Sequence, residues 1–276
     1  LVGSEMCIRD RRMLERYGSK IRYCQRWGGW LVFDGQRWSK DYLLQVDDWV
    51  RGLCSEASAE ALQTIENANK AERIATRCAS AATMAAVAKV ASKDRSVAID
   101  VDAFDADPFK LNTPGGIVDL VTGSLAAHDP NGLHTRMTAV SPDFKRTPKT
   151  WLEFLDTATN GDKDLQGYLQ RLAGYALTGS TKEQMLAFFH GDGGNGKGTF
   201  LNTMQAIMAS YAVAAPMDTF TATKHERHST ELAGLQGARM VTAQETQEGR
   251  RWDEAKVKAL TGGDPVTARF MRQDNF

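Results

Sequence analysis

A glycine-rich stretch at residues 190–199 holds the residue types best suited to chemistry. Its order, His-Gly-Asp-Gly-Gly-Asn-Gly-Lys-Gly-Thr, contains the G-x-x-x-x-G-K pattern of phosphate-binding loops. Glycines let backbone N–H groups converge on phosphate oxygens, and Lys197 adds a positive charge beside the β- and γ-phosphates. The predicted ATP- and phosphate-binding residues are Gly191, Asp192, Gly193, Gly194, Asn195, Gly196, Lys197, Gly198 and Thr199.

The segments on both sides of this loop fit a nucleotide-binding unit. The apolar run 186–189 predicts a buried strand before the loop. Residues 200–211 predict a helix after it, because their apolar side chains recur at spacings of three and four. The free N-terminus of that helix would add a positive dipole. Strand, loop and helix in this order favour nucleotide binding over a glycine-rich turn that carries a lysine by chance.

One position departs from the common pattern. Most such loops have Ser or Thr directly after the lysine, and its hydroxyl binds Mg²⁺. This chain has Gly198 there and Thr199 one residue later. One residue along a helix is a rotation of about 100°, so Thr199 replaces the missing hydroxyl only if the loop start shifts. Otherwise a water molecule fills the place. ATP and Mg²⁺ are the predicted cofactors.

A P-loop motor also needs an acid at the end of a second strand. Residues 239–245 fit this role, because a short β run there ends at Glu245. Many motors have two acids at this place, one for Mg²⁺ and one that polarises the attacking water. Gln244 occupies the first position, so Glu245 is expected to do most of this work. Lys197 and Glu245 are the predicted catalytic residues, with Thr199 and Glu245 as the predicted contacts to Mg²⁺. The alternative for Glu245 is an exposed glutamate on an edge strand.

Four basic residues near the C-terminus are candidates for DNA binding. They bracket the glycine-containing turn 260–265, and basic side chains on such a loop suit a phosphate backbone. These residues are Lys256, Lys258, Arg269 and Arg272.

Composition limits the class of protein. The 276 residues are 42% hydrophobic and 25% charged, and no apolar run approaches the length of a membrane span, so a globular protein without a membrane segment is expected. The 34 basic and 34 acidic residues give a net charge of zero, so any nucleic-acid binding must come from local surfaces. The four cysteines form no C-x-x-C pair, which indicates reduced thiols and a cytoplasmic protein.

The front half of the chain predicts small elements without chemistry of their own. Residues 30–38 predict a β-hairpin with Asp34-Gly35 in its turn. The tryptophans around it are assigned to a small core rather than to a stacking surface for single-stranded DNA. Residues 43–92 predict two or three alanine-rich helices. A turn and a strand at 111–120 follow, and then two helices, the first with Thr150 and Glu153 as a capping box.

The motifs, taken together and in order, resemble superfamily 3 helicases. The resemblance rests on Gly-Asn-Gly-Lys at 194–197, Gly-Ala-Arg at 237–239, the acid in 243–246, and the segments 258–264 and 268–272. More narrowly, the chain resembles the C-terminal part of phage- or plasmid-type primase–helicases, which are related to the poxvirus primase–helicase. This similarity extends upstream through 172–179, 111–123 and 30–38.

The resemblance implies an α/β fold with a P-loop core related to AAA+ ATPases, preceded by a mixed helical and β-hairpin domain. The expected division is an accessory domain at 12–179 and an ATPase domain at 180–276. Residues 1–11 resemble a translated sequencing adapter and are expected to be non-native. The family also implies a ring, typically a hexamer, and an upstream primase domain. Its sensor asparagine and arginine finger are expected beyond Phe276, so this chain is expected to bind nucleotide weakly and not to unwind DNA.

Three functions are compatible with the sequence. The first is an ATP-dependent DNA helicase or translocase, part of a phage or plasmid replication primase–helicase. The second is a nucleotide-dependent DNA-binding or ring-assembly module with little or no hydrolysis, which Gly198 and Gln244 keep open. The third is a small-molecule kinase, for which only the pair Arg250 and Arg251 offers support.

Overall fold

The computed structural model describes residues 11–222, 230–243 and 251–262. These residues form a mixed α/β fold with small sheets and divide into two compact units. Unit 1 contains the chain up to residue 106 together with 128–135, and unit 2 contains 107–127 and the chain from 136 onward. The boundary expected from the sequence, between an accessory domain ending at residue 179 and an ATPase domain beginning at residue 180, is a different division and stays a prediction. None of the helices in the described ranges is long and apolar enough to cross a membrane.

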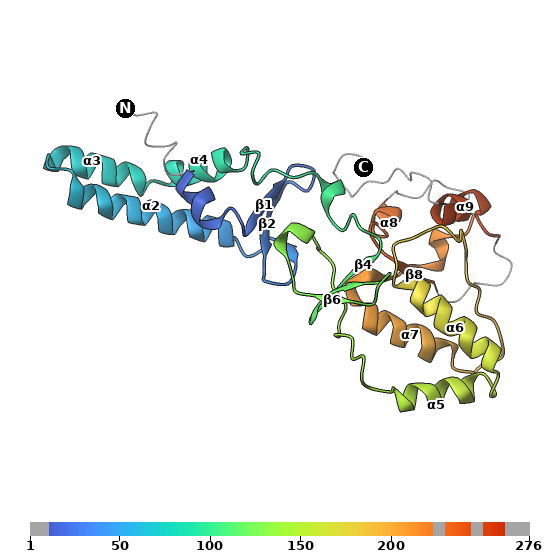
Figure 1. Cartoon of the computed structure of the whole chain (residues 1–276). Coiled ribbons are helices and arrows are strands. Elements are labelled where there is room, and N and C mark those ends of the chain that lie inside the picture. Colours follow the sequence, from blue (N-terminus) through green and yellow to red (C-terminus); the bar gives the residue numbers. More distant parts are fainter. Residues whose placement is uncertain (1–10, 223–229, 244–250, 263–276) are drawn as a thin grey trace. The chain divides into compact units, whose positions relative to one another are not determined.

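Unit 1 contains a helix over residues 11–17 and a three-stranded antiparallel sheet (Figure 1). The strands, in sheet order, are β1 Ile21–Cys24, β2 Gly29–Phe33 and β3 Trp38–Lys40. Strands β2 and β3 are the predicted hairpin, with Phe33 opposite Trp38. The hairpin is therefore confirmed, and β1 adds a third strand that the sequence pattern did not predict.

The turn of this hairpin lies one residue later than predicted. The Asp34 N–H donates to the Arg37 carbonyl at 3.0 Å, so the two central residues are Gly35 and Gln36. Asp34 Oδ1 accepts hydrogen bonds from the N–H groups of Gln36 and Arg37, both at 2.8 Å. Asp34 thus closes the turn instead of occupying its centre, because its carboxylate replaces a backbone acceptor. Gly35 supplies the positive φ, +99°.

The tryptophans of unit 1 pack into its cores, as predicted. Trp38 is 1% exposed and belongs to a cluster with the half-buried Trp27, which stacks on Phe104 with ring centroids 5.1 Å apart. Trp30 and Trp49 pack against a second cluster formed by the sheet and the helices. These rings serve the core, so no open aromatic stacking surface is formed by them.

The alanine-rich region folds as three helices, which confirms that prediction. They are α2 Gln45–Thr64, α3 Ala68–Cys78 and α4 Ala81–Ala91. Helices α2 and α3 lie side by side, and α4 continues along α2 beyond α3 (Figure 1). The side chains of Asn67 and Ser80 cap α3 and α4 by accepting the N–H groups of Lys70 and Thr83. The apolar contacts are uneven, because Val87 is fully buried while Val90 is 41% exposed.

The segment 128–135 belongs to unit 1 because the hairpin and Asp105 hold it. The Trp38 indole donates to the Pro130 carbonyl at 2.8 Å, and the Trp38 N–H donates to the His134 carbonyl at 2.7 Å. Asp105 accepts hydrogen bonds from the N–H and hydroxyl groups of Thr135. Burial alone would raise the pKa of Asp105, but the nearby imidazole of His134, whose Nδ1 lies 3.8 Å from the carboxylate, and the hydrogen bonds from Thr135 outweigh it and lower the pKa below its usual value.

Unit 2 contains an antiparallel sheet, a parallel strand pair and the remaining α-helices of the described residues. The antiparallel sheet consists of β4 Lys110–Thr113, β5 Gly116–Asp119 and β6 Leu125–Ala126, and the parallel pair of β7 Ala212–Ala214 and β8 Met240–Thr242. The helices are α5 Lys149–Ala158, α6 Lys163–Ala176, α7 Lys197–Met208, α8 Thr230–Ala233 and α9 Glu254–Gly262. Short 3-10 turns occur in both units at Val101–Ala103, Pro130–Gly132, Ala209–Tyr211 and Met217–Thr219.

One core joins β4, β5, the parallel strand pair and the helices α5, α6 and α7 of unit 2. This core contains four buried side chains from the apolar face that was predicted for the helix after the glycine-rich loop. They are Phe200, Met204, Met208 and Tyr211. They pack against Leu111 and further residues of the antiparallel sheet, α5 and α6. The predicted helix is thus confirmed as α7, followed by a 3-10 turn, although Ile207 of the same predicted face is 37% exposed.

The predicted capping box before α5 is wrong. The helix begins at Lys149 with Pro148 as its N-cap, and no side chain accepts a hydrogen bond there. Thr150 lies inside the first turn, where its backbone is already helical and its hydroxyl cannot act as a cap. The next helix, α6, does have a side-chain cap, because Asp162 accepts the Leu165 N–H at 3.0 Å.

Candidate nucleotide-binding site

The glycine-rich loop curls around the start of α7. Gly191, Gly194 and Gly196 have φ values of +146°, +76° and +84°, which side-chain-bearing residues rarely adopt. Gly196 is the N-cap of α7, and a Cβ there would lie 2.9 Å from the Ala158 Cβ and 3.0 Å from a Phe154 ring carbon. Glycine is therefore required at position 196 by both its conformation and its contact with α5.

The ammonium group of Lys197 lies inside this loop. Its Nζ donates to the carbonyls of Gly191 and Asp192, at 2.8 and 3.1 Å, and to Asn195 Oδ1 at 2.7 Å. Lys197 is the first residue of α7, and the first backbone N–H groups of a helix have no partner within the helix. The loop thus brings a lysine ammonium and the positive end of a helix dipole to one exposed place, which suits the phosphates of a nucleotide.

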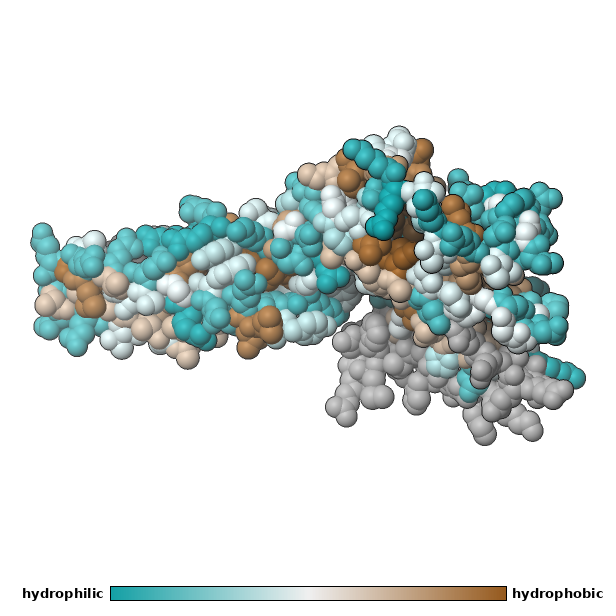
Figure 2. Space-filling model, turned by 90° about the horizontal axis from the view of Figure 1, so that it is seen from below, coloured by the Kyte–Doolittle hydropathy of each residue, from teal (hydrophilic) through white to brown (hydrophobic). Residues whose placement is uncertain are grey.

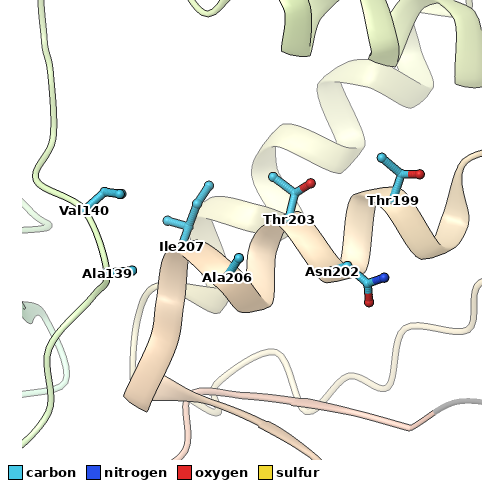
Figure 3. Close-up of a pocket in the computed structure, with 7 residues that line it drawn as sticks. All are labelled: Ala139, Val140, Thr199, Asn202, Thr203, Ala206 and Ile207. Carbon is cyan, nitrogen blue, oxygen red and sulfur yellow. The ribbon is translucent and has the colours of Figure 1, made fainter.

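The two positions after Lys197 differ in what they offer. Gly198 is open, and a Cβ placed there would meet no atom within 4 Å. Thr199 lines a groove of about 630 Å³ along α7, together with Asn202, Thr203, Ala206, Ile207, Ala139 and Val140. Figure 3 shows these α7 side chains along the helix from Thr199 to Ile207, which lies beside Val140. The Thr199 hydroxyl has no hydrogen-bond partner in the described part of the chain.

The strand predicted before the loop is absent. Residues 183–190 have no strand or helix structure, and Leu186 and Phe188 are 53% and 72% exposed. An apolar run becomes a strand only when a neighbouring backbone pairs with it, and none of the described strands pairs with 186–189. Phe189 alone reaches the core, where its ring stacks on Phe200 with centroids 5.8 Å apart.

The predicted second strand is present as β8. It pairs in parallel with β7, with Ala212 opposite Met240 and Ala214 opposite Thr242. The Gln205 side chain of α7 donates a hydrogen bond to the Thr242 hydroxyl. Gln244 and Glu245 lie outside the described residues, so the catalytic and Mg²⁺-binding roles of Glu245 stay predictions.

The residues predicted to bind DNA do not form one surface in the described part of the chain. Lys256 is half-buried on α9, and its ammonium lies 3.6 Å from the Asp253 carboxylate. Lys258 is exposed and two residues further on, so it points to nearly the opposite side of the helix. Arg269 and Arg272 lie outside the described residues.

The sequence analysis missed the residues that hold α7 and β8 to the antiparallel sheet. Arg239, just before β8, donates to the carbonyls of Leu177 and Lys110 at 2.7 and 2.6 Å. Its guanidinium also lies 4.5 Å from the Tyr211 ring centroid, and the Tyr211 hydroxyl oxygen accepts the Asn112 N–H at 3.1 Å. The signal available in the sequence was the motif 237–239, which carries Arg239 but gives no indication of its partners.

A second arginine holds the segment after the antiparallel sheet. Arg136 donates to the carbonyls of Ser210 and Gln236, which flank β7 and β8. The Met137 N–H donates to the Ser210 hydroxyl at 2.7 Å, and that hydroxyl donates to the Met137 carbonyl at 2.9 Å. The segment after the C-terminal end of α7 and the segment before β8 are therefore held by both arginines.

The loop fits a nucleotide triphosphate better than the described residues fit a metal. No group of three or more His, Cys, Asp or Glu side chains that could hold a metal ion occurs in the ranges that the structure describes. The loop instead offers one ammonium, glycine N–H groups and a helix N-terminus, which are ligands for phosphate oxygens. Mg²⁺ would depend on those oxygens and water, together with Thr199 and Glu245.

Comparison with known proteins places the front half of the chain. Residues 10–160, more than half of the chain, match the protein family described as D5 N terminal like. The chain belongs to this family. Residues 189–276, which include the loop, match a family of unknown function, DUF5906. The D5 N terminal like match supports the primase–helicase part of the sequence resemblance and does not reach superfamily 3 itself.

The chain is also similar to a protein of Acanthamoeba polyphaga mimivirus that is named "Putative helicase L207/L206". The two are 26% identical over 117 residues, which make up 41% of this chain and 12% of the mimivirus protein. The chain therefore spans only a small part of this relative's length. Membership in the D5 N terminal like family and this similarity together make the chain primase–helicase-like.

Proposed function

We propose that this chain is the ATP-dependent helicase or translocase part of a phage or plasmid replication primase–helicase. Lys197 and the glycine-rich loop bind the phosphates of ATP. Glu245 polarises the attacking water and contributes to Mg²⁺ binding. This assignment corresponds to a superfamily 3 P-loop ATPase core related to the AAA+ ATPases.

The single observation that carries the proposal is the geometry of the loop. Three glycines with positive φ surround the Lys197 ammonium at the exposed N-terminus of α7. A nucleotide phosphate can take the place of the carbonyl and amide oxygens that now accept from Lys197, because an ionised acceptor makes a stronger hydrogen bond. Family membership and the helicase-named relative add the link to replication.

The remaining parts of the proposal concern partners. DNA is the proposed polymer substrate, contacted in part by Lys258 and by Arg269 and Arg272 beyond the described residues. The proposed assembly is a ring of identical subunits, in the form of a hexamer, in which a neighbouring subunit would bring its arginine finger to each glycine-rich loop. A primase domain is the proposed upstream partner. The proposed place of action is the cytoplasm of the host cell.

Titration with a fluorescent ATP analogue tests the loop directly. Substitution of Lys197 by alanine should weaken binding about 10- to 100-fold, because a charge-assisted hydrogen bond to phosphate is lost. Lys182→Ala is the matched control, since Lys182 is exposed and lies before the loop. Equal binding by the unsubstituted chain and Lys197→Ala would refute the assignment of the phosphate site.

A second function is favoured by the open position at Gly198. Without a hydroxyl there, nucleotide could bind and order a DNA-binding or ring-assembly module with little hydrolysis. ATP turnover with and without single-stranded DNA separates the two functions. DNA-stimulated turnover that is lost in Lys197→Ala supports the motor. Bound nucleotide without turnover supports the assembly module, and turnover gained by Gly198→Ser would then identify the missing hydroxyl as its cause.

A further inference from the structure

Helix α3 of unit 1 has one side for packing and one side for solvent. Its buried residues are Ala71, Ala75 and Cys78, and the helix packs closely along α2. On the solvent side, Lys70, Arg73 and Arg77 follow at spacings of three and four, so they lie within about 60° of one another around the helix axis. This row, the α3 basic row, is centred roughly 130° away from the buried face.

Charge is segregated along these helices although the whole chain is neutral. Residues 68–95, which span α3 and α4, contain six basic and two acidic side chains, for a net charge of +4. Helix α2 contains one basic and four acidic side chains, for a net charge of −3. The chain as a whole is neutral, but the basic segment 68–95 lies next to the acidic helix α2.

The acidic side chains of α2 do not neutralise the basic row. Glu56 and Glu60 form ion pairs with Arg16 and Arg12 of the helix over residues 11–17, at 2.9 and 2.6 Å. The charged side-chain groups of the α3 basic row make no ion pair or hydrogen bond with the described residues. All three are exposed, so their charges are available to a partner.

The stability of α3 does not account for the row. Lys70 lies in the first turn, where a positive charge opposes the helix dipole, and that turn contains no acidic residue. Arg73 and Arg77 are like charges four residues apart, a spacing that destabilises a helix. Only Arg77, in the last turn, is favoured by the dipole. The row as a whole is a cost to the helix, which points to a role in binding.

We propose that the α3 basic row binds the phosphate backbone of duplex DNA. The row extends about 10 Å along the helix, over which a duplex presents several phosphates. Residues 68–95 contain no aromatic side chain, so the surface offers nothing on which unpaired bases could stack. Contacts of this kind position a protein on DNA without reading its sequence. Helices α2, α3 and α4, at the left of Figure 2, show mainly hydrophilic residues with separate apolar spots on the visible side.

This DNA contact lies in unit 1 and does not depend on the nucleotide loop of unit 2. It can therefore be tested without ATP, and its failure is distinguishable from a failure of the proposed ATPase. The probe is a fluorescein-labelled 30-base-pair duplex of random sequence, whose anisotropy is followed at several salt concentrations. A single-stranded oligonucleotide of the same length is titrated in parallel.

The test variant is Lys70→Gln, Arg73→Gln, Arg77→Gln combined in the 276-residue chain. Loss of three phosphate contacts should reduce the slope of log affinity against log salt by about 2 to 3 and weaken duplex binding on the order of tenfold or more. The control variant replaces the exposed Lys145, Arg146 and Lys149 of unit 2 by glutamine, which changes the net charge equally. It should bind the duplex like the unsubstituted chain.

Two further results decide between explanations. Glutamine is a good helix former, so the triple variant should melt at the same or a higher temperature, and a lower melting temperature would assign the row a structural role. Duplex affinity and salt slope that stay unchanged in the triple variant would overturn the proposal and leave an acidic protein as the partner of this surface. A loss confined to the single strand would also overturn it.

Discussion

Two parts of unit 2 are held in opposite ways. The antiparallel sheet and the segment after it are tied to α7 and β8 by side chains that bond to backbone groups far away in sequence, chiefly through Arg136 and Arg239. The glycine-rich loop is exposed, and its side-chain hydrogen bonds are those that Lys197 makes with Gly191, Asp192 and Asn195. A rigid scaffold and an easily rearranged loop suit a site in which a ligand replaces internal contacts.

The antiparallel sheet with α7 and β8 is here called the scaffold. If the scaffold determines stability and the glycine-rich loop determines ligand binding, substitutions in the scaffold should lower the free energy of unfolding, and substitutions in the loop should weaken nucleotide binding. The largest effect is expected at Tyr211, which is fully buried in the core of unit 2. Tyr211→Ala should lower the free energy of unfolding by about 3 to 5 kcal/mol, measured by urea denaturation followed by circular dichroism.

Tyr211→Phe is the matched variant, because it keeps the ring and removes only the oxygen that accepts the Asn112 N–H. It should cost about 1 to 2 kcal/mol. If Tyr211→Phe were as damaging as Tyr211→Ala, the hydrogen bond and not the packing of the ring would hold the scaffold.

The next effect is expected at Arg239. Arg239→Met keeps much of the stem and removes the bonds to the carbonyls of Leu177 and Lys110, so it should lower the free energy of unfolding by about 2 to 3 kcal/mol. Arg239→Lys should recover part of that loss, since an ammonium reaches one carbonyl more easily than two. Urea denaturation gives both values. A neutral Arg239→Met would show that the scaffold does not depend on this contact.

A smaller effect on stability, with a large one on function, is expected in the loop. Gly196→Ala places a Cβ against Ala158 and Phe154 at a residue with φ of +84°, and should cost about 1 to 3 kcal/mol. It should also weaken binding of the ATP analogue, because the first turn of α7 shifts. Gly193→Ala is the control, since a Cβ there meets no atom within 4 Å. Equal nucleotide binding by the two variants would break the link between loop shape and function.

The smallest effect concerns pH and the antiparallel sheet. Hydrogen bonds from Lys110 and from the N–H groups of Thr122 and Val121 lower the pKa of Asp119 to about 2. Because the folded pKa lies below the unfolded value, this contribution to stability is complete above about pH 4. It is lost as pH falls towards 2. Asp119→Asn should be less stable than the unsubstituted chain at pH 6, and the difference should shrink as the pH approaches 2. Thermal melting across this range measures it.

The chemistry-bearing loop could be predicted from sequence because its function demands residue types at fixed spacings. Phosphate binding requires glycines before a lysine, and the helix that follows has a period of 3.6 residues, so α7 and its buried face were predicted. The helices of unit 1 and the hairpin at 30–38 were predicted for the same reason, since local periodicity and turn residues define them.

The errors occurred where a structure depends on a distant partner. The apolar run 186–189 has the composition of a strand, but strand formation depends on a neighbouring backbone that composition does not reveal. The contacts of Arg239 and Arg136 were missed because their acceptors are backbone carbonyls, which every residue possesses. The capping box at Thr150 failed for a different reason: the N-cap lies two residues earlier, at Pro148, which places the Thr150 hydroxyl inside the first turn and not at the cap.

The hydrogen bond from the Gln205 side chain to the Thr242 hydroxyl joins α7 to the end of β8. Gln205 lies eight residues after Lys197 on the same helix, about 12 Å along its axis. The parallel pairing of Thr242 with Ala214 of β7 holds the same residue through its backbone. The end of β8 is therefore anchored both to its neighbouring strand and to the helix that begins at Lys197, so a displacement of that helix would be transmitted to the last residue of β8.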